Sequence, residues 1–317
     1  MFLLNSKKIE RHLKLRFIKI SMTKLPEFKG NPLVEIPKSI PTANVLGGDF
    51  GKTVLQEYKQ VAETTYKSAD ALDVLSYHND VIEGSNPFAV VLTNQIVSQE
   101  GLRAATPADL ERAIRLNKVN QQLGLNLRGT YEDSGLVLRS EDEPNEYLAK
   151  NLAKQIKARQ SLKPPVMIPL NGLELVNDSQ SEHDLSFKLK EDAQVIYAPI
   201  LNKSGNFTFE DIDEQTGLPK KIGDNGDRTL YTRSNGLSGL CLSGSLGLYS
   251  GWGDLAGSGS DGRVAVVGDS AVDSEKYVAE INRSSTERKA KLQRLLDEAE
   301  AKKSKIDDET IAQLRKQ

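Results

Sequence analysis

Apolar residues recur at helical spacing in the first half of the chain. Residues 54–61 and 71–82 carry this spacing, and residues 87–99 form a strongly apolar segment. Thr106 and Pro107 suit the N-cap and first position of a further helix. Before these helices, the Pro- and Gly-rich residues 22–51 read as an extended arm. We therefore predict an extended arm and helical region over residues 22–124.

Beyond Gly124 the apolar runs become short, which predicts strands. One helix interrupts them, opened by Pro144 and carrying an apolar stripe over residues 147–156. The connection over 202–228 is polar and turn-rich. The fold class is thus α+β, with a ligand-binding domain over 125–268. The expected strands lie at 136–138, 166–170, 173–176, 185–189, 195–200 and 264–267.

The two ends of the chain differ from the middle. Residues 1–21 carry six Lys or Arg against Glu10 alone. A membrane-surface or nucleic-acid arm is one interpretation. A weakly ordered leader, or untranslated sequence with the true start at Met22, is the favoured one. Residues 269–317 predict a charged helical tail, either coiled coil or packed on a surface, and the helical regions could mediate homo-oligomerisation.

Composition excludes several function classes. Lys plus Arg number 42 against 44 Asp plus Glu, a net charge of −2, so charge gives no reason to expect nucleic acid as a partner. One Cys excludes an intrachain disulfide framework, a CxxC pair and a Cys-based zinc site. No run reaches the length of a membrane span and no signal-peptide pattern is present, so the location stays open.

Three short motifs resemble known sites but fail on their context. Residues 47–53 (GGDFGKT) have Leu46 where a phosphate-binding loop needs Gly. Residues 257–262 (GSGSDG) match GxGxxG but precede a strand, whereas a dinucleotide site follows one. Residues 143–145 spell the EPN of calcium-dependent lectins, without the partner triplet downstream.

No catalytic residue emerges from the remaining candidates. Asp211, Asp213 and Glu214 lack the spacing of an EF-hand loop and are expected in a solvated turn. Cys241 has no base nearby in sequence, the closest His being His183. We therefore expect a protein that is not an enzyme, without metal or cofactor.

Residues 234–262 carry the strongest signal. Nine Gly and seven Ser occupy sixteen of these twenty-nine positions, but leucines interrupt them regularly. L-x-L recurs at 240–242 and 246–248, which puts these leucines on one face of short extended segments. The residues between them, Cys241 included, are then expected to face outward. The alternative is an ordinary Gly-rich loop with Trp252 buried.

The composition of this stretch is also biased. From Ser234 to Val267 there is no Lys, Glu, Gln or Met. The outward positions hold Ser, Gly, Tyr, Asp and Cys, all reachable from an Asn codon when its two adenines are randomised. Trp252 is not reachable and would have to be a fixed position.

With these features, residues 125–268 resemble the target proteins of diversity-generating retroelements, whose C-type-lectin-like domain carries a hypervariable face. The resemblance rests on the lead-in TLYTRSNGLS (229–238), the L-x-L scaffold and the closing GRVAVV (262–267). It implies a C-type-lectin-like fold, related to formylglycine-generating enzymes, in which a constant strand ends the variable segment. The known oxidative chemistry of those enzymes uses paired cysteines, which this chain lacks. The chain also continues to Gln317 after the closing strand, whereas many family members end close to it.

We therefore predict a ligand-binding face that works like an antibody paratope, with an unknown protein or surface ligand as partner. Tyr249 and Trp252 are the expected anchors. An alternative is a structural or assembly protein, such as a virus or phage fibre component without a diversified site. The full set of candidate ligand-binding residues is Cys241, Ser243, Ser245, Tyr249, Trp252, Asp254, Ser258, Ser260 and Asp261.

Overall fold

The computed structural model describes residues 27–28, 31–32, 43–119, 125–268 and Arg294, and it divides into two units, 1–38 and 39–317. In the first unit, β1 (Glu27–Phe28) pairs antiparallel with β2 (Asn31–Pro32). The predicted basic leader, and the predicted charged tail apart from Arg294, lie outside the described residues. The following paragraphs concern the second unit.

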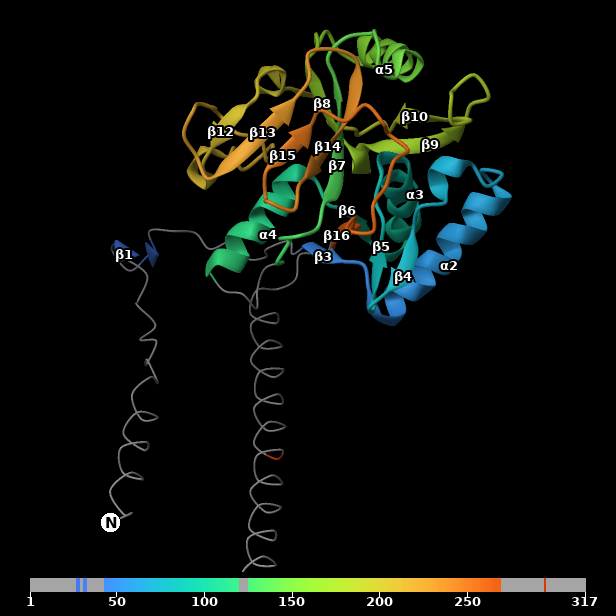
Figure 1. Ribbon diagram of the computed structural model, residues 1–317, viewed down its shortest axis with the longest axis horizontal. Helices are drawn as coiled ribbons and strands as arrows, with labels where there is room; N and C mark the ends of the chain where they lie inside the picture. Colours follow the sequence, from blue (N-terminus) through green and yellow to red (C-terminus); the bar gives the residue numbers. More distant parts are fainter. Residues whose placement is uncertain (1–26, 29–30, 33–42, 120–124, 269–293, 295–317) are drawn as a thin grey trace, which may run out of the picture. The chain divides into compact units, whose positions relative to one another are not determined.

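Four α-helices occur among the described residues of this unit (Figure 1). The prediction of helices over 54–61, 107–116 and 147–156 is confirmed, and the apolar segment 87–99 is also helical. This last helix is capped by Asn86, whose side chain accepts a hydrogen bond from the backbone N–H of Ala89. The helices are α2 (Gly48–Thr64), α3 (Pro87–Val97), α4 (Pro107–Val119) and α5 (Glu146–Arg159).

Two helix predictions are wrong, one in the type of structure and one in where the helix begins. The segment 71–82 is a short 3-10 helix, η1 (Asp70–Leu72), followed by a hairpin of β4 (Ser76–His78) and β5 (Val81–Glu83). Its turn residues Asn79 and Asp80 have φ of 48° and 66°, the left-handed conformation that tight hairpins require. Helix α5 begins at Glu146 rather than Pro144, because Asn145 has φ of 62° and belongs to the preceding connection.

A seven-stranded sheet forms the centre of the unit, in the order β11-β8-β7-β14-β15-β13-β12. All neighbours are antiparallel except β13 and β15, which run parallel. The run expected as a strand at 195–200 is cut short by the 3-10 helix η4 (Pro199–Asn202), and the connection 202–228 contributes β12. The strands are β7 (Glu132–Leu138), β8 (Val166–Pro169), β11 (Ile196–Tyr197), β12 (Gly205–Phe207), β13 (Arg228–Thr232), β14 (Leu237–Leu242) and β15 (Leu248–Ser250).

Three smaller sheets accompany the large one among the described residues of this unit, and the β4–β5 hairpin is one of them. Strand β16 (Ala265–Gly268) lies between β3 (Ala43–Val45) and β6 (Leu102–Ala104), so the first and last described strands of the unit belong to one sheet. β9 (Leu173–Asn177) pairs with β10 (Leu185–Leu189). The remaining 3-10 turns are η2 (Ser98–Glu100), η3 (Leu170–Gly172) and η5 (Phe209–Asp211).

The large sheet is buried by apolar side chains on both faces. Along β7, Leu136 and Leu138 enter the core that contains α2, α3 and α5, whereas Val137 enters the core that contains α4. This alternation follows from the two-residue period of a strand. Both cores draw residues from 43–119 and from 125–268, so these two parts pack as one unit.

No helix within the described ranges has the length and apolar character needed to cross a membrane.

Candidate functional site

Three aromatic side chains meet on one face of the large sheet. Tyr231 of β13 and Tyr249 of β15 are direct partners across the parallel ladder, and their ring centroids are 5.8 Å apart. The ring of Trp252, just beyond β15, lies 5.5 Å from that of Tyr249, edge to face. Tyr231 is 56% exposed and Trp252 60%. We call these three residues the aromatic face.

Among the described residues, neither helix-bearing core covers the side of β13 and β15 that carries the tyrosines. Leu230 and Leu248, the preceding residues of β13 and β15, are buried on the opposite side against the α4 core. On the side of the tyrosines, the α3 and α5 core reaches β7, β8 and β14, and among the described residues it contains none from β13 or β15. Because Tyr231 is 56% and Trp252 60% exposed, more than half of each side chain is open to a partner.

The leucine scaffold predicted beneath the face is confirmed. Leu240, Leu242 and Leu248 are buried in the α4 core, together with Leu246 of the intervening turn. Trp252 is exposed, so the alternative of a loop with a buried Trp is wrong.

The predicted exposure is wrong for Cys241, which is 6% exposed. Cys241 does point away from the core that holds Leu240 and Leu242, and it pairs with Tyr249 on β15 and with Asp133 on β7. The start of α3 and the loop after β15 cover this side of β14, where a Cβ added at Gly239 would lie 3.6 Å from Pro87 and 3.9 Å from Leu255. Burial, and then the charges of Asp133 and Glu132, raise the pKa of Cys241, so it stays a protonated thiol that neither a ligand nor a substrate reaches.

Ser243 and Ser245 lie in the turn between β14 and β15. Their hydroxyl oxygens are 3.1 Å apart, and Leu246 has φ of 65°. The carbonyl of Leu246 accepts a hydrogen bond from Nε of the buried Arg228, so this turn is fixed from beneath. The two serines thus come just before β15, the strand that carries Tyr249.

The remaining candidates lie in the loop 251–262, which is anchored rather than free. Leu255 is fully buried, and the carbonyl of Ala256 accepts a hydrogen bond from Nδ2 of the buried Asn86. Asp254 folds its own turn by accepting from the N–H groups of Ala256 and Gly257. This anchoring holds Trp252 beside Tyr249.

Ser258, Ser260 and Asp261 are exposed residues of the same loop. The Ser258 hydroxyl accepts from the backbone N–H of Ser85, so it is a structural contact as well as a surface group. The carbonyl of Asp261 accepts from the N–H of Tyr131. The structure thus brings Tyr249 and Trp252 together, and places the three loop residues where the loop meets α3 and β7.

Sequence reasoning missed a polar group beneath this loop. Asp133 accepts a 2.7 Å hydrogen bond from the Ser85 hydroxyl, and the Tyr131 hydroxyl donates to the Ser85 carbonyl. Burial raises the pKa of Asp133 to about 6, although the bond from Ser85 opposes this. Ser85 precedes an Asn-Pro helix start, which is the one local signal that could have drawn attention to it.

Sequence reasoning also missed Tyr231 and Arg139. The buried Arg139 guanidinium donates to the hydroxyls of Ser238, Ser250 and Thr232, one from each of β14, β15 and β13. Desolvation by burial, and then the charge of Arg233, lower the pKa of Arg139 to about 10. Arg139 therefore fixes the three strands that bear the aromatic face relative to one another.

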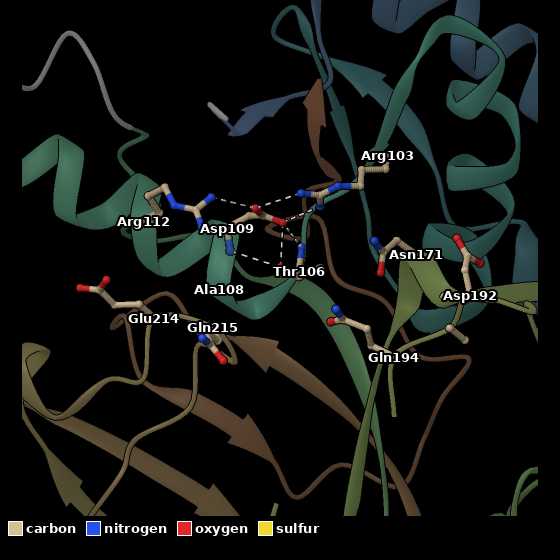
Figure 2. Close-up of a pocket in the computed structure, with 12 residues that line it drawn as sticks. Arg103, Thr106, Ala108, Asp109, Arg112, Asn171, Asp192, Gln194, Glu214 and Gln215 are labelled. Carbon is tan, nitrogen blue, oxygen red and sulfur yellow. Dashed lines mark hydrogen bonds and ion pairs between the residues drawn. The ribbon is translucent and has the colours of Figure 1, made fainter. Parts of the chain in front are cut away.

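A separate polar cleft of about 470 Å³ lies at the first turn of α4 (Figure 2). Its principal feature is the buried Asp109. The carboxylate of Asp109 accepts a hydrogen bond from the backbone N–H of Thr106 and forms ion pairs with Arg103 (2.6 Å) and Arg112 (3.2 Å). Burial opposes ionisation of Asp109, but the bonds and charge of Arg103 and the bonds of Thr106 outweigh it and lower the pKa. Because both guanidinium groups already contact Asp109, the arrangement is explained by the fixing of α4.

Within the part of the chain that the structure describes, no three His, Cys, Asp or Glu side chains lie close enough to hold a metal ion together. Comparison with family models, curated proteins and solved structures finds no match to this chain.

Proposed function

We propose that this chain is a non-enzymatic binding protein that presents a hypervariable recognition face on a C-type-lectin-like scaffold, as in the targets of diversity-generating retroelements. The observation that carries the proposal is the aromatic face: three adjoining rings on a rigid sheet, open to solvent. Tyr and Trp give broad contact area with little loss of rotamer entropy, and small polar neighbours adapt their hydrogen bonds.

Two further features support a diversified segment here. The exposed side chains of Ser245 and Ser260 project from a backbone whose leucines are buried, so changing them costs the core little. The segment also ends at β16, which pairs with the first strand of the unit, as a constant closing strand would.

The test is the DNA that flanks the gene. We expect a second, imperfect copy of the stretch encoding 234–267 beside a reverse-transcriptase gene. Its differences should fall on adenines, in codons for the exposed Ser245 and Ser260 and the half-buried Tyr249, and not in codons for the buried leucines. Differences spread equally over buried and exposed codons would contradict a diversified face. A flanking region without such a copy would leave 234–262 as a Gly/Ser-rich loop.

A second test uses the protein. A partner that binds the full chain should be lost when Tyr249→Ala or Trp252→Ala is introduced, without a change in thermal unfolding. The matched control is Tyr197→Ala, because Tyr197 is 56% exposed on β11, four strands away from β15 in the sheet. Equal binding by all three variants would refute the assignment of the face.

A further inference from the structure

The aromatic face comes from two different parts of the sequence. Tyr249 and Trp252 belong to the stretch proposed to be diversified, whereas Tyr231 precedes it. Parallel pairing of β13 with β15 places Tyr231 opposite Tyr249, so the exposed surface of the two tyrosines is continuous. The ring of Tyr231 therefore lies outside the segment that is proposed to be diversified.

The strand that carries Tyr231 is fixed relative to the strand that carries Tyr249. The hydroxyls of Thr232 and Ser250, the residues that follow the two tyrosines, are 3.1 Å apart. Both accept hydrogen bonds from Nη2 of Arg139, at 2.5 and 2.7 Å. These bonds do not involve the Tyr249 side chain, so a change at Tyr249 leaves the backbone that presents Tyr231 held in the same way.

The constant side of the surface extends beyond Tyr231 in both directions along the chain. Thr229 lies two residues earlier in β13 and so shares its face, and its hydroxyl donates to Oδ1 of Asn206 on the neighbouring β12, at 3.0 Å. Arg233, two residues later, donates a 3.2 Å hydrogen bond to the carbonyl of Gly251, the residue before Trp252. The centres of protein–protein interfaces are likewise enriched in Tyr, Trp and Arg.

The shape of the face also favours a protein over a small molecule. Small ligands bind in concave sites that enclose most of their surface. The clefts of about 470 and 280 Å³ in this structure are lined by other residues, not by the three aromatic side chains. Rings spread over two strands and a following loop instead suit the broad surface of a folded partner.

We propose that the recognition face is composite: Tyr231 is a constant anchor that contacts the partner in every variant, and the partner is a folded protein. This inference rests on the function proposed above and assigns a division of labour within that site. The constant half supplies affinity that does not depend on the variant, and the variable half distinguishes one partner from another.

The experiment is a library of the full chain, displayed on cells, with codons 243, 245, 249 and 260 randomised and Trp252, Asp254 and Tyr231 retained. It is selected separately on three immobilised probes: lysozyme, serum albumin and dextran. Tyr231→Ala and Tyr231→Thr are then introduced into each selected clone, the latter because Thr keeps the preference for strand. Tyr197→Ala, which removes an equally exposed tyrosine from the same sheet, is the matched control.

We expect clones that bind lysozyme or albumin, and we expect both Tyr231 variants to weaken every one of them about tenfold or more. Tyr197→Ala should change the affinity less than twofold, and thermal unfolding should show that all variants remain folded. Clones that keep their affinity without the Tyr231 ring would overturn the constant anchor alone. Clones recovered only on dextran would overturn the protein partner. Failure to select any clone on any probe would count against the recognition function itself.

Discussion

The ion pair between Glu111 of α4 and Arg228 of β13 gives a sharp test of how the strands that bear the aromatic face are supported. The side chains are 3% and 1% exposed, and the two contacts between guanidinium and carboxylate measure 2.6 and 2.5 Å. The guanidinium also lies 4.7 and 4.5 Å from the ring centroids of Phe207 and Phe209. Replacing Glu111 by Ala leaves this cation buried without its counter-ion, which costs about 3–5 kcal/mol.

The assay is thermal and urea unfolding of the Glu111→Ala variant, of an Arg228→Met variant and of the double variant. We expect a fall of roughly 10 °C in the unfolding midpoint for Glu111→Ala. The double variant should recover most of this, because an apolar replacement of both partners leaves no unpaired charge. Glu214→Ala is the control: it breaks the exposed pair with Arg115, 2.7 Å long, and should cost about 0–1 kcal/mol. If Glu111→Ala is as mild as this control, or if the double variant is no better than Glu111→Ala, the reasoning is refuted.

Two further changes test other buried polar groups. Burial raises the pKa of Glu132 from 4.5 to about 7, so the folded state holds a proton that the unfolded state releases, and stability is lost as the pH rises from about 4.5 through 7. The Glu132→Gln variant should lack this loss. In urea unfolding, the free energy of unfolding of the variant minus that of the wild type should be about 3 kcal/mol more favourable at pH 8 than at pH 4. Equal pH dependence of the two proteins would contradict this. Asn86→Ala removes the α3 cap and the bond to the Ala256 carbonyl, which should cost about 2 kcal/mol and speed amide exchange at Gly257 and Gly259. Exchange at those two amides unchanged from the wild type would show that Asn86 does not hold the loop.

The features that the sequence predicted well are those set by the spacing of neighbouring apolar residues. The buried leucines at 240, 242 and 248 follow from alternation, since each is decided by its own neighbours in the strand. The hairpin at 76–83 was missed because its apolar residues also fit helical spacing. The turn at Asn79 and Asp80, where the left-handed conformation is tolerated by these residue types, decides between the two.

What the sequence could not predict depends on pairing between distant strands. Tyr231 joins the face only because β13 runs parallel to β15, and no local pattern specifies that partner. Cys241 is buried because the start of α3 and the loop after β15 cover its side of β14, and no local pattern specifies that cover. The same limit applies to Arg139, whose three hydroxyl partners come together only in the folded sheet.

The structure also separates two causes for the many small residues of 234–262. At Gly253 an added Cβ would lie 2.6 Å from the Pro144 ring, and at Gly262 it would lie 2.6 Å from the backbone nitrogen of Ser85. These glycines allow the loop to seat on its neighbours, and a side chain there would displace it. Ser245 and Ser260 are small for no such reason, because both are exposed. A flexible linker would need neither property. The proposed recognition surface needs both of them, namely glycines that hold the loop in place and solvent-facing positions that are free to change. It follows that randomising Gly253 or Gly262 should yield variants with a displaced loop and no binding to any probe, while randomising Ser245 or Ser260 should change which partner binds.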